Sequence, residues 1–180
     1  MIGKTLIKDH ILPGRDLGEV FNEVNNILCK SNSENLFITA FVGVLDLSTG
    51  EFPYVNAGHE MPLICHEGSF EAYRIAPGFV LAGIENMQYK AGCFTLTEGD
   101  KLFQYTDGVT EATDADDCLY GLGRLTDILG RNSNDSPEEI IRAVKRDIDD
   151  FVGDAPQFDD ITMLCLTFKK RRSGETGEAD

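Results

Sequence analysis

The segment Lys101-Leu-Phe-Gln-Tyr-Thr-Asp107-Gly108-Val-Thr-Glu111-Ala112 is the stretch from which the organisation of the chain is best predicted. Residues 102–106 alternate as in a β-strand, and the alternation stops abruptly at the Asp-Gly pair. Glycine permits a backbone turn that a residue with a side chain resists. We therefore expect the Asp107 carboxylate at the end of a core strand, with Gly108 forming a tight turn beside it. The alternative is that Asp107 is only a turn residue, since Asp-Gly is a common turn pair.

A second acidic segment, Gln157-Phe-Asp159-Asp160-Ile-Thr162, precedes the apolar run of residues 161–168. Two carboxylates at the ends of two core strands can share one hard cation, because Mg²⁺ and Mn²⁺ prefer oxygen ligands. Adjacent like charges are costly to bury without a counter-ion, which favours a cation near this pair over a plain charged turn. The sequence thus indicates a cation that Asp107 can share with at least one carboxylate of the pair Asp159 and Asp160.

The composition excludes several classes of function. A formal net charge of −15 argues against a nucleic-acid-binding face, which would need a basic patch. The chain has no apolar run of 18 residues and no signal peptide, so we expect a cytoplasmic protein without membrane insertion. Five cysteines without a C-x-x-C spacing predict free thiols in a reducing compartment.

The hydrophobic periodicity predicts a layered α+β fold. Helices are expected over residues 1–11, 17–29, 121–129 and 137–152, and strands over 36–47, 51–55, 61–65, 70–75, 92–96, 102–106 and 161–168. Residues 36–47 are apolar on both faces, which is typical of a central strand covered by other layers. Helices and strands are grouped instead of alternating, and this favours antiparallel sheets over βαβ units.

Several short blocks together resemble a known family. They are Phe37-Ile-Thr-Ala-Phe41, Leu45-Asp46 with Thr49-Gly50, Tyr54-Val-Asn-Ala-Gly-His59, Leu81-Ala-Gly83, Gly99-Asp100, Tyr105 to Ala112, Tyr120-Gly121, and Gln157 to Thr162. Each block is weak alone, but their order over residues 37–167 is similar to that of the metal-dependent protein phosphatases of the 2C-like class. The most similar branch is the stage II sporulation protein E and stress-regulator type.

The resemblance implies a four-layer α-β-β-α sandwich with two Mn²⁺ or Mg²⁺ ions, where a metal-activated hydroxide attacks phosphoserine or phosphothreonine. Carried over by motif, Asp107 and Asp159 are the catalytic metal ligands, and Gly108 belongs to the same metal motif. The resemblance implies a protein phosphatase in bacterial stress signalling. Its substrate would be a phosphorylated protein similar to an anti-anti-sigma factor, in a sigma-factor partner switch.

The sequence departs from the family in its first 36 residues, where the two upstream acidic motifs have no counterpart. We therefore expect residues 1–168 to be a domain truncated at its N-terminus, followed by a disordered polar tail over 169–180. Such a domain would hold one ion or none and hydrolyse phosphoproteins weakly by itself. Its open sheet edge predicts a homodimer. The alternative function is a non-catalytic regulatory or binding module that keeps the fold but lacks a complete metal site.

The remaining polar candidates are assigned supporting roles. Asn56 to His59 includes a histidine, yet a tight turn with Asn or Gly in the left-handed conformation is the favoured interpretation. Asn56 and His59 are kept as supporting residues near the site. Asp160, beside Asp159, and Glu111, four residues past Asp107 and within reach of the site through water, are kept as supporting residues too. His10 and His66 lack companions at metal-ligand spacing and are expected at the surface.

Overall fold

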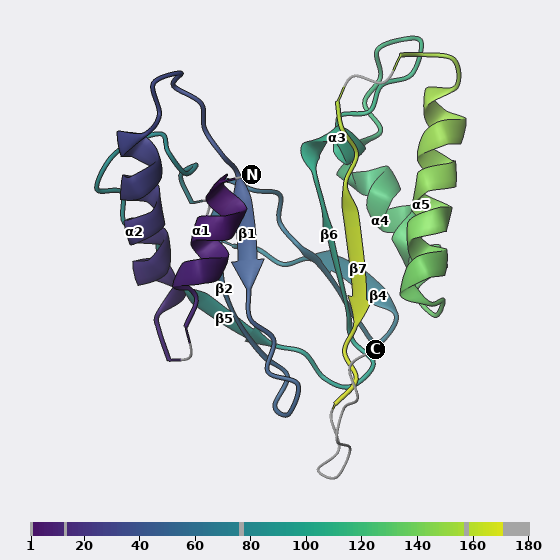
Figure 1. Ribbon diagram of the computed structural model, residues 1–180. Coiled ribbons are helices and arrows are strands. Elements are labelled where there is room, and N and C mark those ends of the chain that lie inside the picture. Colours follow the sequence, from purple (N-terminus) through teal and green to yellow (C-terminus); the bar gives the residue numbers. More distant parts are fainter. Residues whose placement is uncertain (1, 13, 76–77, 157–158, 171–180) are drawn as a thin grey trace. The chain divides into compact units, whose positions relative to one another are not determined.

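The computed structural model describes residues 2–12, 14–75, 78–156 and 159–170 (Figure 1). The chain forms two compact units. The first unit comprises Met1–His59 and Ile75–Thr95, and the second comprises Glu60–Arg74 and Leu96–Asp180. Each unit contains an antiparallel sheet and helices, so the predicted α+β class with antiparallel sheets is confirmed.

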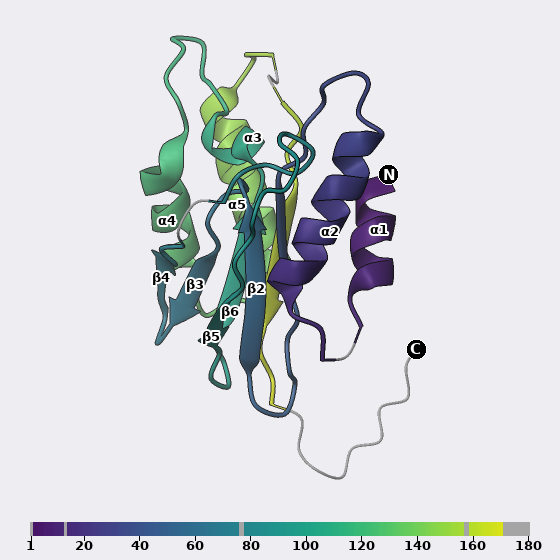
Figure 2. The ribbon, with the colours of Figure 1, turned by 90° about the vertical axis from the view of Figure 1, so that its left-hand side faces the viewer.

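The first unit contains two helices and a three-stranded sheet. The helices are α1 (Ile2–His10) and α2 (Leu17–Lys30), and the strands β1 (Ala40–Gly43), β2 (Glu51–Ala57) and β5 (Gly92–Thr95) lie in the order β1-β2-β5. Figure 2 shows α1 and α2 side by side. Asp16 caps α2, because its carboxylate accepts a hydrogen bond from Glu19 N at 3.0 Å. Phe21 on α2 packs with Val55 on β2 in the core of this unit.

The prediction of a long central strand over residues 36–47 is wrong. In the sheet of the first unit β1 spans four residues and lies at the edge. Asn32 instead holds the backbone of Leu36, donating to its carbonyl at 2.6 Å and accepting from its N–H at 2.9 Å. Leu36 and Phe37 are 67% and 66% exposed. Apolar residues on both faces therefore do not indicate burial here, because the segment begins in a loop and only Ala40–Gly43 join the sheet, at its edge.

The second unit contains a four-stranded sheet with two longer helices. The strands β3 (Leu63–His66), β4 (Ser69–Ala72), β6 (Lys101–Tyr105) and β7 (Met163–Thr167) lie in the order β4-β3-β6-β7. The helices are α3 (Asp107–Thr110), α4 (Gly121–Arg131) and α5 (Pro137–Val152). Figure 1 shows α4 and α5 beside the sheet, where Leu125 and Val144 pack with Phe103 in one apolar core. The predicted start of α5 is confirmed by a complete capping box between Ser136 and Glu139.

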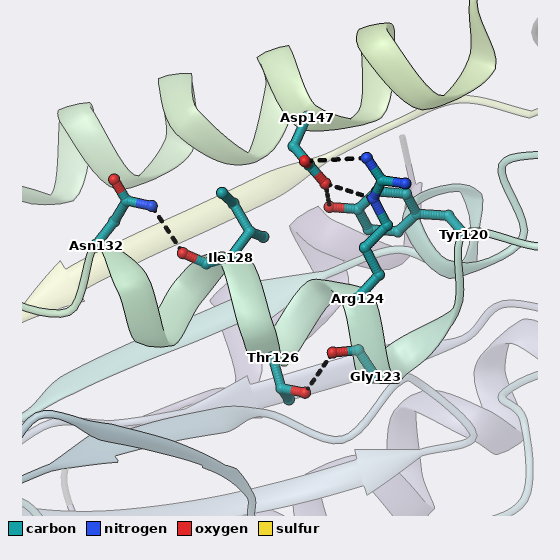
Figure 3. A network of polar contacts seen from close by, with 7 residues as sticks. All are labelled: Tyr120, Gly123, Arg124, Thr126, Ile128, Asn132 and Asp147. Atoms are coloured by element: carbon teal, nitrogen blue, oxygen red, sulfur yellow. Dashed lines mark hydrogen bonds and ion pairs between the residues drawn. The ribbon is translucent and has the colours of Figure 1, made fainter.

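A polar network ties the start of α4 to α5 (Figure 3). The Tyr120 hydroxyl donates to the Asp147 carboxylate at 2.7 Å, and the Arg124 guanidinium donates to both of its oxygens at 2.8 and 3.1 Å. These hydrogen bonds, chiefly that from Arg124, hold the pKa of Asp147 below its usual range. Tyr120 N also donates to Ala112 O at 2.8 Å. The network thus fixes the segment that follows α3.

Three further predictions concern the cysteines, membrane-spanning helices and the C-terminal tail. All five cysteines are free thiols, as predicted. In the described part of the chain, no helix is long and apolar enough to cross a membrane. The predicted tail over residues 169–180 lies almost wholly outside the described residues, because nothing after residue 170 is described.

Candidate metal centre

Strand β6 delivers Asp107 to an open position at the end of a buried strand. β6 pairs with β3 on one side and with β7 on the other, so it is central in its sheet. Tyr105 is 3% exposed, whereas Asp107, two residues later, is exposed. The chain enters α3 at Asp107, whose carboxylate accepts a hydrogen bond from Gly108 N at 3.0 Å. A rigid strand therefore positions a carboxylate that solvent can reach.

Thr106 joins this strand end to the second acidic segment. Its N–H donates to Thr162 O at 3.1 Å, and its hydroxyl accepts from Thr162 N at 3.0 Å. The same hydroxyl donates to Asp160 O at 3.0 Å. Three hydrogen bonds thus extend the contact between β6 and β7 beyond the ends of both strands. They place the Asp159–Asp160 peptide beside the start of α3.

Gly108 is required by this contact and not by a turn. It lies within α3, and its φ angle is not positive, so the predicted tight turn is wrong. A Cβ atom at this position would lie 2.6 Å from Asp160 O and 3.5 Å from Asp159 C. Only glycine lets the two backbones approach this closely. The structure therefore brings Asp107-Gly108 against Asp159-Asp160; a cation shared by Asp107 and Asp159 stays a prediction.

A third carboxylate, that of Glu60, lies beside this site and was missed by the sequence analysis. Burial raises the pKa of Glu60, and the charges of Asp107 and Glu111 add to the rise. A hydrogen bond from the Tyr105 hydroxyl acts in the opposite direction. The Tyr105 pKa is raised in turn, first by burial and then by Glu60. In the sequence, Glu60 is marked only by its position immediately after His59.

Glu111 and Asp160 lie around the same site. Both side chains are exposed. Glu111 N donates to Asp107 O at 2.8 Å, and the Glu111 charge acts on Glu60. Asp160 N donates to the Asp159 carboxylate at 2.6 Å. Asp160 N thus orients the Asp159 carboxylate, and a supporting role of Asp160 at the site stays a prediction.

Beside these residues lies a cavity of about 180 Å³. Gly108 and Asp159 line it on one side, and Ile148 of α5 provides part of its apolar wall. An ion pair between Lys145 and Asp149, with 2.5 Å between nitrogen and oxygen, lies on its rim. The site therefore adjoins a space with both apolar and charged walls.

Asn56 and His59 form the favoured turn and belong to the first unit. The Asn56 side chain donates to His59 O at 2.9 Å and accepts from His59 N at 2.8 Å. Gly58 takes the left-handed conformation, with φ of 71°. The His59 ring lies 3.2 Å from the Thr39 hydroxyl. These contacts explain both residues structurally, and their supporting role at the site stays a prediction.

The other histidines lie at or near the surface. His10 is half-buried, and its Nδ1 lies 2.8 Å from Leu6 O. The His66 side chain is 61% exposed, as expected, but its Nδ1 lies 2.9 Å from the carboxylate of Asp100, which is 7% exposed. The sequence analysis missed this companion of His66.

Comparison with known proteins decides the family. The profile described as Stage II sporulation protein E (SpoIIE) matches residues 1–169. The chain belongs to the SpoIIE family. It is 31% identical to Protein IcfG of Synechocystis over 73% of this chain and 20% of that protein. It is 29% identical to the phosphoserine phosphatase RsbU of Bacillus subtilis over 52% of this chain and 28% of that protein. The chain therefore spans less than a third of either relative.

Solved structures show the fold of this SpoIIE-family chain. The SiaA PP2C domain of Pseudomonas aeruginosa superposes with a TM-score of 0.79 at 19% identity, covering 94% of this chain and 68% of that one. The RsbU and RsbW domains of a Mycobacterium tuberculosis protein give 0.75 at 22% identity, covering 95% and 47%. The manganese-presoaked phosphatase domain of Bacillus subtilis SpoIIE gives 0.67 at 15% identity, covering 94% and 74%. The predicted phosphatase-2C-like fold is confirmed.

The donor groups of this SpoIIE-family chain fit a hard divalent cation. Mg²⁺ is commonly held by one or two carboxylates and retains several water molecules. Asp107 and Asp159 supply two exposed carboxylates on adjoining segments, and the contact at Gly108 leaves no room for a Cβ. Within the described ranges, no group of three or more His, Cys, Asp or Glu side chains converges as a metal site. Further ligands would therefore be water or backbone oxygens.

Proposed function

We propose that this chain is a metal-dependent phosphoserine/phosphothreonine protein phosphatase domain. Membership of the SpoIIE family supports the proposal, and so does the fold shared with PP2C domains. The observation that carries it is the contact of Gly108 with the Asp159–Asp160 peptide, which places two exposed acidic segments together at one end of a sheet.

Asp107 and Asp159 would hold Mn²⁺ or Mg²⁺, with one or two ions according to the ligands available. The chemistry that such ions supply is activation of water and neutralisation of phosphoryl charge. The residues of the chain provide position: β6 holds Asp107, and the Thr106 hydroxyl holds the peptide that carries Asp159. Glu111 and Asp160 would support the site from its rim. The adjoining cavity offers space for part of the substrate.

The proposed substrate is a phosphorylated protein of a sigma-factor partner switch, similar to an anti-anti-sigma factor. The name of RsbU, a phosphoserine phosphatase, supports the phosphorylated residue. The Mycobacterium tuberculosis structure, in which RsbU and RsbW domains occur in one protein, supports the regulatory setting. This role would place the protein in the bacterial cytoplasm, within stress signalling.

The experiment is a phosphate-release assay with a phosphoserine protein as substrate and Mn²⁺ added. The protein is used in the longest form that its gene encodes. Wild type is expected to release phosphate, Asp107→Asn and Asp159→Asn to lose the activity, and Asp127→Asn, on the exposed side of α4, to keep it. Unchanged activity in Asp107→Asn would contradict the proposal. Binding of the phosphoprotein without any release would favour the non-catalytic module.

A further inference from the structure

The register of the sheet, continued beyond its paired residues, places Glu60 beside the end of β6, next to Asp107. β3 and β6 pair antiparallel, with Leu63 opposite Phe103. Counting outward along both chains puts Glu60 opposite Thr106, the residue immediately before Asp107. The paired residues end at Leu63 and Phe103, and beyond them a hydrogen bond from Gln104 Nε2 to Glu60 O, at 2.8 Å, holds the Glu60 backbone beside β6. Glu60 is therefore fixed where β6 ends.

The Glu60 side chain lies beside β6 as well. The residue is half-buried, and the neighbouring hydroxyl of the buried Tyr105 acts to lower the pKa of its carboxyl. Besides burial, the charges of Asp107 and Glu111 raise its pKa, and both of these residues are acidic. A half-buried carboxylate that faces two other carboxylates is unfavourable unless positive charge is present. No described contact of Glu60 supplies that charge.

We propose that Glu60 is a positioning residue of the cation site, a fixed negative charge that strengthens divalent-ion binding at Asp107 without ligating the ion. This inference rests on the proposed function and adds a residue to it. A carboxylate beside a ligand attracts the ion electrostatically and hydrogen-bonds to the ligands and water around it. Tyr105 and Gln104 make the charge effective by keeping it in one position.

A cation at this site would offset the repulsion among the three neighbouring carboxylates. Without an ion, Glu60, Asp107 and Glu111 repel one another, and removing one charge relieves that repulsion. With an ion, the same charge contributes to binding. Neutralising Glu60 therefore has opposite effects on the stability of the ion-free protein and on ion affinity. A purely structural role would not produce these opposite signs.

The test compares Glu60→Gln with wild type by calorimetric titration with Mn²⁺ and by thermal melting in a chelator. The glutamine keeps the main-chain carbonyl that accepts from Gln104 and a side-chain oxygen for Tyr105. Loss of such a neighbouring group typically weakens metal binding roughly 10- to 100-fold, and this is the expected loss. In chelator the melting temperature of Glu60→Gln should equal or exceed that of wild type.

Two further variants keep the test decisive. Tyr105→Phe keeps the buried ring and removes only the hydroxyl, so it should weaken Mn²⁺ binding less than Glu60→Gln does. Glu98→Gln neutralises an exposed carboxylate before the other end of β6 and should leave binding unchanged. Wild-type affinity in Glu60→Gln, together with lost binding in Asp107→Asn, would overturn this inference and leave the proposed function standing. Wild-type affinity in both variants would remove the site and the proposed function with it.

Discussion

Replacing Gly108 with alanine tests the contact that joins the two acidic segments. The new Cβ would lie 2.6 Å from Asp160 O, closer than real Cβ contacts come, and a tight 3.1 Å from Asp160 C. Both atoms belong to the backbone, so no side-chain rotation relieves the overlap. Forcing an extra methyl group into such a contact costs about 1–3 kcal/mol. Gly→Ala in an unstrained helix ordinarily stabilises by about 0.5–1 kcal/mol, which leaves a net loss of roughly 0–2.5 kcal/mol.

The matched control is Gly123→Ala on α4. A Cβ there meets no atom within 4 Å, and the residue is exposed. Gly123→Ala should therefore stabilise the protein by about 0.5–1 kcal/mol. Urea unfolding measures both changes, and thermal melting should separate the variants by several degrees, since about 1 kcal/mol shifts the midpoint roughly 2–4 °C in a chain of this size. If Gly108→Ala stabilises as much as Gly123→Ala does, the close contact does not exist and the placement of Asp159–Asp160 is wrong.

Three other predictions concern single interactions. Thr106→Val removes the hydroxyl that contacts Asp160 and Thr162, so the free energy of unfolding should fall by about 1–3 kcal/mol. Mn²⁺ affinity should fall with it. An unchanged affinity in calorimetric titration would contradict the role of this contact in positioning Asp159. Ser136→Ala removes the cap of α5 and should cost about 1 kcal/mol in urea unfolding; no loss would mean that Glu139 caps the helix unaided. The hydrogen bond to Asp100 raises the pKa of His66, so its stabilisation is present below pH of about 6.5 and lost as pH rises through the folded pKa. The melting temperature of wild type should thus fall relative to that of His66→Gln above that pH. A constant difference between the two melting temperatures from pH 5 to 8 would contradict this.

Elements specified by local signals were predicted well. The start of α5 depends on a serine, a proline and a glutamate within four residues, and the end of β6 on an Asp-Gly pair. These signals are formed by residues a few positions apart, so they can be read directly from the sequence. The overall fold was predicted from the family resemblance, because many individually weak sequence blocks occurring in the family's order are together specific.

Features that depend on pairing between distant segments were not predictable. The edge position of β1 follows from which strands pair with it, and apolar alternation does not encode this. Gly108 was expected to form a turn, because its real constraint, the carbonyl of Asp160, comes from another strand. Glu60 reaches the site through the register of β3 on β6, which local patterns do not specify. The missed α3 has four residues, too few for a periodic signal.

The central claim is that Asp107 and Asp159 bind one common cation, and a double-mutant titration with Mn²⁺ tests it most directly. Wild type, Asp107→Asn, Asp159→Asn and the double variant are compared by calorimetry under identical conditions. Two ligands of one ion form a unit, so each single change should remove most of the binding and the double change should add little. The thermal stabilisation by Mn²⁺, about 2.7 kcal/mol at a hundredfold excess over Kd, should disappear in parallel. Wild-type binding in either single variant, or losses that add fully in the double variant, would contradict a shared ion.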